Sequence, residues 1–403
     1  MEPKTSFSSL RPQDPVQAGL RPPQKRHRYW LHLTLFLLTF VSTVYAGGTF
    51  AGRILRYEEL GVWWFVPDGL LFGFSLLLFL SVHEFGHFFA ARYHGISTSL
   101  PYYIPAPVIF TGTLGAIIRI REPIPSIKKL FDIGAAGPIA GFVVALGLLL
   151  YGLATLPSPE YLLDLTGHEE IKAFIREYGR FPDTPPAGNP EEGSLNLVVG
   201  RTLLYWGLSQ LFPNVPPMYE IYHYPVLWAG WLGLFFTALN LLPVGQLDGG
   251  HILYALVGRK WHAILARIFV LVLLISGAIG FVNDFFPSFR EYNQIVGSLS
   301  WFILAAILYF FLNRVFEGDH RLIAPTLLAV MAIVAIATVI GPAAMRFGYS
   351  GWLIFGLLIV LFIKIDHPPV LYSAPLTPGR RSLAILALLI FVLCFSIRPI
   401  YVG

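Results

Sequence analysis

Two histidines and a glutamate stand in an arrangement that suits metal chemistry. His83, Glu84 and His87 form the pattern His-Glu-x-x-His. On a helix, residues four apart lie on one face, so His83 and His87 can share a metal ion. Glu84 is turned about 100° around the axis, and from there its carboxylate can reach a water on the metal without binding the metal itself. Two imidazole ligands and a carboxylate general base are the active-site groups typical of a zinc hydrolase.

The surroundings of this pattern favour the metal site over a simpler interpretation. In a soluble helix, two histidines at this spacing are often ordinary polar residues. Here the pattern lies inside an apolar run, residues 66–91, that is apolar enough to span a membrane. Ionisable side chains in hydrocarbon are expensive unless they face a cavity and have partners. We therefore expect His83, Glu84 and His87 to share a metal-binding cavity.

A second polar segment, residues 240–251, can complete the site. Pro243 and three glycines are expected to break the helix here, and broken helices with polar residues at membrane depth mark binding sites. Asp248 is the predicted third ligand, because two histidines and a carboxylate leave the fourth position of a tetrahedral zinc for water. Alternatively, Asp248 caps a helix that begins at Gly249. The two roles are compatible.

Further polar residues compete for a place at this site. Asn240 is expected to face the bundle core, where its amide can hydrogen-bond an oxyanion or a substrate carbonyl; a hydrogen bond between helices is the alternative. The other candidate histidines are expected at surfaces or interfaces rather than on the metal, and His251, three residues past Asp248, is the one to watch. These histidines are His94, His223, His251, His262, His320 and His367.

The composition indicates a polytopic membrane protein. The 403 residues are 55% hydrophobic and only 13% charged, whereas a soluble domain carries about 25% charged residues. The net charge of +5 does not predict nucleic-acid binding, because the basic residues fall largely at the ends of apolar runs, where they set orientation. The single cysteine, Cys394, excludes an intramolecular disulfide and a cysteine zinc cluster.

Nine apolar runs follow a polar N-terminal tail. The tail, residues 1–29, is predicted to be disordered, and its basic residues 25–28 place it in the cytoplasm. Most runs have close to the roughly 17–25 residues that span a bilayer, so we expect an all-α polytopic membrane protein with about nine transmembrane helices. The runs are residues 30–46, 66–91, 133–153, 225–242, 264–281, 295–312, 322–340, 352–365 and 383–397.

Two segments between the runs are not expected to be transmembrane helices. Residues 111–120 are short and interrupted by glycines, and they follow a proline-rich stretch. This pattern predicts a re-entrant β-hairpin or strand between the second and third helices. Such a segment is tolerated at membrane depth only where it lines a cavity or packs on protein. Residues 157–223 form the longest loop, which is acidic and is expected on the extracytoplasmic side.

Together these motifs resemble the site-2 protease family of intramembrane zinc metalloproteases, peptidase family M50. The resemblance rests on residues 83–87, on Gly137-Pro138 and on residues 240–249, and it covers about residues 70–256. The chain is most similar to the branch without a PDZ domain, which includes the chloroplast EGY-type proteases and many bacterial relatives. Residues 112–116, Gly-Thr-Leu-Gly-Ala, are similar to that branch.

The resemblance implies one Zn²⁺ per chain, with His83, His87 and Asp248 as ligands and Glu84 as general base. It also implies cleavage of membrane proteins within or near their transmembrane segments, a process called regulated intramembrane proteolysis. Residues 111–120 are similar to a family segment thought to pair with unwound substrate. Thr113 and Gly115, with Asn240, are therefore candidate substrate or oxyanion contacts.

The predicted organisation is a tail (1–29), a membrane-embedded metalloprotease core (30–260) with its outer loop (157–223), and additional C-terminal helices (261–403). The expected partners are transmembrane protein substrates and the lipid bilayer. A bacterial inner membrane is the expected location and an organelle membrane the alternative.

Two other functions stay open. The chain could be a metal-ion transporter, since His and Asp inside helices suit ion passage, or an inactive relative that binds membrane helices. The position of Glu84 beside the histidine pair weighs against transport.

Overall fold

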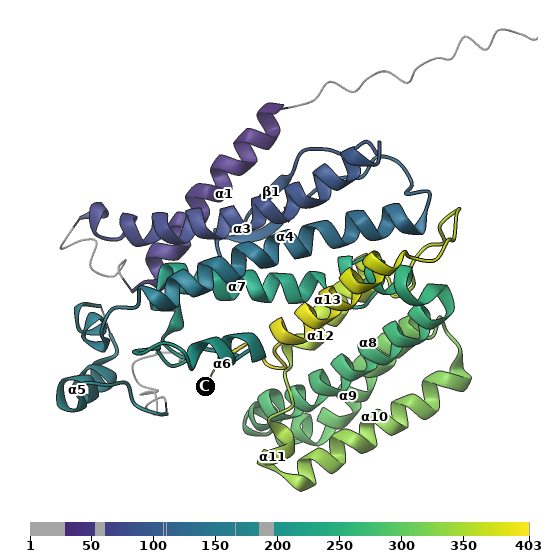
Figure 1. Cartoon of the computed structure of the whole chain (residues 1–403). Coiled ribbons are helices and arrows are strands. Elements are labelled where there is room, and N and C mark those ends of the chain that lie inside the picture. Colours follow the sequence, from purple (N-terminus) through teal and green to yellow (C-terminus); the bar gives the residue numbers. More distant parts are fainter. Residues whose placement is uncertain are drawn as a thin grey trace, which may run out of the picture.

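In the computed structural model, helices make up most of the chain (Figure 1). The structure describes residues 29–52, 61–107, 109, 111–165, 167–184 and 197–402, so the tail predicted for residues 1–29 lies almost entirely outside the described residues. The α-helices are α1 (Tyr29–Phe50), α3 (Val66–Tyr93), α4 (Ile127–Ala154), α5 (Glu169–Tyr178), α6 (Leu203–Ser209), α7 (Pro225–Asn240), α8 (Asp248–Tyr292), α9 (Gln294–Val315), α10 (His320–Ile340), α11 (Pro342–Met345), α12 (Gly351–Leu358) and α13 (Pro378–Cys394).

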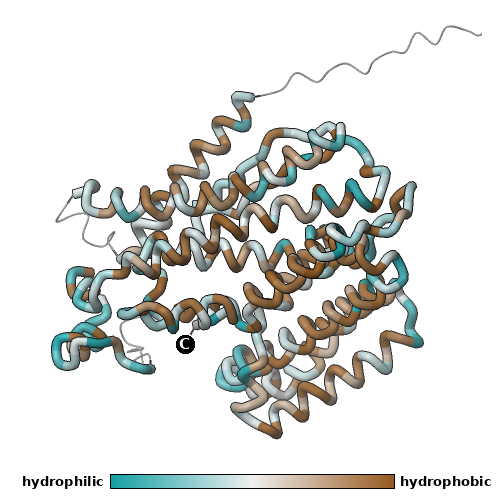
Figure 2. Tube along the Cα trace, viewed as in Figure 1, coloured by the Kyte–Doolittle hydropathy of each residue, from teal (hydrophilic) through white to brown (hydrophobic). Residues whose placement is uncertain are grey.

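Five of the described helices are long and apolar enough to cross a membrane: α1, α3, α4, α8 and α10. Three further helical segments are apolar but shorter. They are α7, the part of α9 from Leu299 to Val315, and α12 together with the π-helical turn η6 (Ile359–Ile363) that continues it. Apolar residues run along the helices, and polar residues gather at helix ends and in connections (Figure 2). The protein is therefore a mostly helical membrane protein. The number of nine transmembrane helices stays a prediction.

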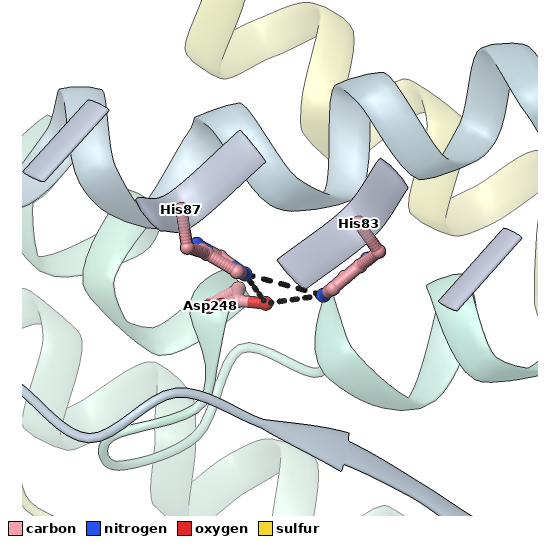
Figure 3. A group of neighbouring side chains, drawn as sticks. All are labelled: His83, His87 and Asp248. Atoms are coloured by element: carbon pink, nitrogen blue, oxygen red, sulfur yellow. Dashed lines mark hydrogen bonds and ion pairs between the residues drawn. The ribbon is translucent and has the colours of Figure 1, made fainter. Parts of the chain in front are cut away.

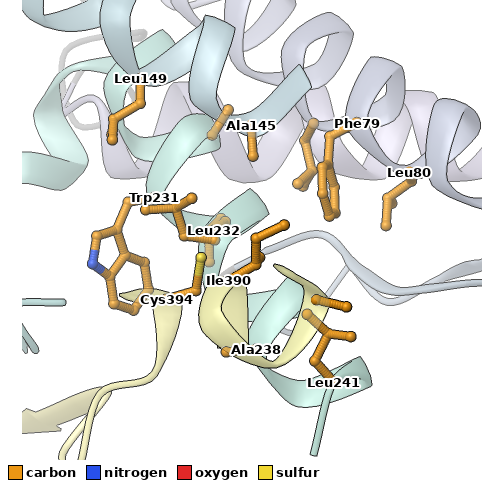
Figure 4. Close-up of a cluster of buried hydrophobic side chains, with 14 of the residues drawn as sticks. Phe79, Leu80, Ala145, Leu149, Trp231, Leu232, Ala238, Leu241, Ile390 and Cys394 are labelled. Carbon is orange, nitrogen blue, oxygen red and sulfur yellow. The ribbon is translucent and has the colours of Figure 1, made fainter. Parts of the chain in front are cut away.

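The helices pack into two groups, each around its own hydrophobic core. Helices α3, α4, α7 and α13 share the first core, whose largest fully buried side chains include Trp228 and Trp231. Figure 4 shows part of this core, in which Ile390 and Cys394 of α13 lie beside residues of α7. Helices α8, α9, α10 and α12 form the second core. The C-terminal helix thus returns to the group that carries the His-Glu-x-x-His pattern.

Helix α8 belongs to both groups because it bends at Gly258. This residue has φ 79° and ψ 173°, a backbone conformation that is essentially restricted to glycine. Before the bend, Ile252 and Ala255 are part of the first core. After the bend, Ala266 and Val270 are part of the second core. The bend keeps the start of α8 with α3 and α4 while the rest of the helix leaves them.

A short two-stranded sheet lies against α1 and α3. Strands β1 (Tyr102–Pro105) and β2 (Thr113–Ile117) pair antiparallel, with Tyr103 opposite Ala116. The Ser42 hydroxyl of α1 donates to the Gly112 carbonyl oxygen at 2.6 Å, and the Ser81 hydroxyl of α3 lies 2.7 Å from that of Tyr103. Residues 113–117 are thus a strand held by two helices. Its re-entrant position in a membrane stays a prediction.

The loop between α4 and α7 contains short elements of several kinds. Besides α5 and α6 it contains the 3₁₀ turns η3 (Pro159–Asp164) and η5 (Ile221–His223) and strand β3 (Leu197–Val199). A further 3₁₀ turn, η2 (Val62–Trp64), precedes α3. Strand β3 pairs antiparallel with β4 (Ile400–Val402). The end of the chain thus contacts the loop of the first helix group, and the separation of residues 261–403 from the core stays a prediction.

Candidate active site

Helix α3 and the first residue of α8 bring together three side chains that could hold a metal ion. His83, Glu84 and His87 of α3 are buried, with 3%, 7% and 7% of each residue exposed. His83 Nε2 lies 3.5 Å and His87 Nε2 lies 3.2 Å from Asp248 Oδ2. The two imidazole Nε2 atoms are 3.2 Å apart (Figure 3). The structure thus joins the two polar segments that the sequence predicts to form one site.

These spacings fit a tetrahedral metal ion. Zinc binds His nitrogen and carboxylate oxygen at about 2.0–2.2 Å, so neighbouring ligand atoms at tetrahedral angles lie roughly 3.3–3.6 Å apart. The three observed separations run from 3.2 to 3.5 Å. A cation between the two ring nitrogens and the carboxylate would also satisfy acceptor groups that otherwise face one another. The residues present therefore fit a zinc ion with three protein ligands.

The backbone of α4 orients one of the two rings. His87 Nδ1 lies 2.7 Å from the Ile133 carbonyl oxygen, so Nδ1–H donates to that oxygen and Nε2 keeps its lone pair. Metal-binding histidines commonly donate their second ring N–H in this way, which fixes both the tautomer and the ring orientation. The His87 ring is thus held with Nε2 toward Asp248.

Three glycines of α4 make room for the histidines. A Cβ built on Gly137 would run into the His87 imidazole, and one on Gly141 would lie 3.0 Å from His83 Nδ1. A Cβ on Gly134 would lie 2.9 Å from the Cβ of His251. The Gly137-Pro138 pair that the sequence analysis singled out therefore belongs to a small-residue face against which the site is built.

The connection between α7 and α8 places Asp248. Helix α7 ends at Asn240, and α8 begins at Asp248 with Leu247 in the cap position. The expectation that Gly249 and Gly250 break the helix is wrong, because both lie in the first turn of α8. A Cβ on either would collide with backbone atoms of residues 241–245. Their small size lets α8 start close to that turn, and the Asp248 side chain is directed at the histidines.

A cavity of about 250 Å³ opens on this cluster. Its lining includes Glu84, Asn240 and His251 together with His83, His87 and Asp248. Asn240 Nδ2 lies 3.3 Å from His83 Nε2. The two imidazoles, the two carboxylates and this amide therefore line one cavity, which has room for several water molecules.

The end of strand β2 and the residue that follows it, residues 116–118, line the cavity, rather than the two residues that the sequence suggests. Residues 116–118 are part of the lining, whereas Thr113 and Gly115 are not. Thr113 Oγ1 donates to the Ile104 carbonyl oxygen at 2.8 Å and accepts from the Gly115 N–H at 3.0 Å. Thr113 and Gly115 thus stabilise the two-stranded sheet that carries the lining residues.

His367 is an unexpected neighbour of the site. The sequence predicts a surface or interfacial position for it, but His367 is 5% exposed and its Nε2 lies 2.8 Å from His251 Nδ1. His367 Nδ1–H donates to the Pro368 carbonyl oxygen, so His367 Nε2 accepts from His251 Nδ1–H. The remaining ring nitrogen of His251 is then an acceptor. The sequence gives one weak indication that this segment matters, the polar Asp366-His367 pair after an apolar run. Because His367 lies 116 residues from His251, the sequence does not indicate that the two residues meet.

Comparisons with known proteins agree with this geometry. The model of peptidase family M50 matches residues 71–283, more than half of the chain. The probable zinc metalloprotease EGY1, chloroplastic, of Arabidopsis thaliana is 30% identical over 257 residues, covering 59% of this chain and 41% of the relative. The probable zinc metalloprotease EGY2, chloroplastic, of Oryza sativa subsp. indica is 32% identical over 219 residues, covering 54% of this chain and 34% of the relative.

The matched part of the chain corresponds to about a third to two fifths of the length of these curated relatives. No solved structure matches the chain significantly. The matched family region contains residues 83–87 of α3, the glycine face of α4 and Asp248 of α8. By motif, by geometry and by family match, the chain belongs to peptidase family M50.

Proposed function

We propose that this protein is an intramembrane zinc metalloprotease that hydrolyses peptide bonds within or near the transmembrane segments of other membrane proteins. The observation that carries the proposal is the convergence of His83, His87 and Asp248 at one cavity that Glu84 also lines. The family match and the names of the relatives, probable zinc metalloproteases, support it.

The proposed roles follow from the position of each group. His83, His87 and Asp248 would hold one zinc ion, which would supply Lewis-acid chemistry by polarising the peptide carbonyl and lowering the pKa of water. Glu84 takes the proton of the attacking water and gives it to the leaving amine. Asn240 offers an amide N–H to the oxygen on which negative charge develops. The buried surroundings strengthen each of these electrostatic effects.

Strand β2 is the proposed place for the substrate backbone. A transmembrane helix hides its carbonyl groups in internal hydrogen bonds, so a substrate must unwind before it reaches Glu84. The two-stranded sheet leaves one edge of β2 without a neighbouring strand among the described residues, and Leu114 and Ile117 on that strand are exposed. An extended peptide can add to such an edge through backbone hydrogen bonds. Residues 116–118 would then guide it toward the cavity.

We place the protein in a membrane with its N-terminus in the cytoplasm. The basic residues before the first helix support this orientation. A bacterial inner membrane is the first candidate. An organelle membrane is the second, and it gains support from relatives whose names place them in the chloroplast.

Cleavage of a membrane-anchored reporter by purified, zinc-loaded protein in proteoliposomes tests the proposal. Glu84→Gln keeps the size of the side chain but removes its basicity, so we expect the cleavage rate to fall about 10²–10⁴-fold while bound zinc is unchanged. Glu291→Gln, at the exposed end of α8, is the matched control and should cleave like the parent.

Full activity in Glu84→Gln would remove Glu84 from the chemistry. No cleavage by the parent, together with zinc flux into the liposomes, would favour the transporter instead.

A further inference from the structure

A second cluster of metal-binding side chains lies in the loop between α4 and α7. His168 precedes α5, whereas Glu220 and His223 lie immediately before α7. His168 Nδ1 is 3.3 Å from Glu220 Oε1, and His223 Nε2 is 3.4 Å from Glu220 Oε2. The Nε2 atoms of the two histidines are 3.1 Å apart. We propose that these three residues bind a second divalent metal ion of the zinc class.

The donor set suits such an ion. Two imidazoles and one carboxylate are a common zinc ligand set, and they leave one position for water. One ligand atom from each of the three residues lies within 4.8 Å of the others. The closest separations, 3.1–3.4 Å, are similar to those of His83, His87 and Asp248. His168 faces Glu220 through Nδ1 and His223 through Nε2, and one of these two nitrogens would bind the ion.

The burial of Glu220 is the second reason. Only 1% of this residue is exposed, and a carboxylate without water or a cation is costly to bury. Among the residues that the structure describes, the ion-pair partners of Glu220 are the two histidines, which are charged only when protonated. A divalent cation at this carboxylate supplies the missing positive charge.

The position of the cluster gives the ion a structural role. His168 and Glu220 are 52 residues apart, and an ion between them fastens the start of α5 to the segment that leads into α7. Gly52, just after α1, also approaches this point: a Cβ there would lie 3.3 Å from the His223 ring. The cluster lies at the start of α7, and Asn240 lies at the end of the same helix. The ion therefore fixes the loop to the helix that contributes Asn240 to the catalytic cavity.

A zinc count on the full chain tests the proposal. Protein stripped with chelator, incubated with Zn²⁺ and gel-filtered should retain two zinc ions per chain, measured by plasma mass spectrometry. The double variant His83→Ala/Asp248→Ala removes the active-site ligands and should retain one. Glu220→Gln should also retain one and should keep the cleavage chemistry of Glu84. Glu169→Gln, an exposed residue of the same loop, is the matched control and should retain two.

The alternative is a hydrogen-bonded triad of His168, Glu220 and His223 without metal. One zinc ion in the parent and none in His83→Ala/Asp248→Ala would establish that alternative and overturn the proposal. This comparison does not depend on a substitution in the loop, because both changed residues lie in α3 and α8. Two zinc ions in folded Glu220→Gln would also overturn it, because the second ion would then lie elsewhere. Failure of the second ion leaves the proposed protease intact, since that is tested by Glu84→Gln.

Discussion

At the scale of residues, the sequence was sufficient to predict which three side chains meet at the site but not their surroundings. His83 and His87 follow from helical spacing, and Asp248 from its broken-helix segment. Nothing in the local pattern revealed that His367 pairs with His251, because the two residues are 116 positions apart and meet only through the packing of the C-terminal helices. Thr113 was chosen by resemblance, yet its hydroxyl is engaged within the hairpin.

Asp248→Asn is the sharpest substitution at this scale. It keeps the shape of the side chain but replaces an anionic ligand oxygen by a neutral amide, so we expect markedly weaker zinc binding at the active site. Competition with a chelator of known affinity measures the change. Asp183→Asn, an exposed carboxylate in the outer loop, should leave zinc binding unchanged. Equal zinc affinity in Asp248→Asn and the parent would exclude Asp248 as a ligand.

At the scale of elements, close helix packing positions the site. Gly86 of α3 shows how near α4 comes, since a Cβ there would lie 2.7 Å from the Ala136 carbonyl oxygen. The sequence showed a glycine-rich start of the third apolar run, but only the structure shows which side chain each glycine faces. The same holds for β2: its glycines and β-branched residues indicated a strand or hairpin, and its pairing with β1 sets which residues reach the cavity.

Gly137→Ala tests the role of the α4 face. The added methyl group enters the space of the His87 ring, and overpacking of this kind typically costs about 1–3 kcal/mol. We expect weaker zinc binding and slower cleavage, because the ring must leave its hydrogen bond to Ile133. Gly147→Ala lies on the same helix where a Cβ meets open space and should behave like the parent. Matching zinc affinities in the two variants would show that His87 tolerates the methyl group.

At the scale of the whole molecule, two helix groups are joined by α8 and by the return of α13. The sequence predicted helical runs along the chain and treated residues 261–403 as additions without chemistry. In the structure, residues of this part contact the first helix group: His367 contacts His251, Arg380 pairs with Asp132 of α4 at 2.7 Å, and β4 joins β3. Such long-range contacts depend on topology, which hydropathy along the chain does not specify.

Gly258→Ala should weaken the whole assembly. A residue with a side chain is strained at φ 79° and ψ 173°, at a cost of about 1–3 kcal/mol, and relief of that strain would change the angle between the two parts of α8. We expect a lower thermal unfolding temperature in detergent, measured by the change in tryptophan fluorescence on heating. Gly147→Ala again serves as control. An unchanged unfolding temperature in Gly258→Ala would mean that the bend does not depend on glycine.

We propose that α3 and α8 together build one zinc-dependent proteolytic centre. Its most direct test is cleavage of a membrane-anchored reporter by chelator-stripped protein before and after zinc is restored, in the parent and in Asp248→Asn. We expect no cleavage without zinc, recovery in the parent and no recovery in Asp248→Asn, because Asp248 supplies the ligand from α8. Continued cleavage by stripped protein, or full recovery in Asp248→Asn, would contradict the account.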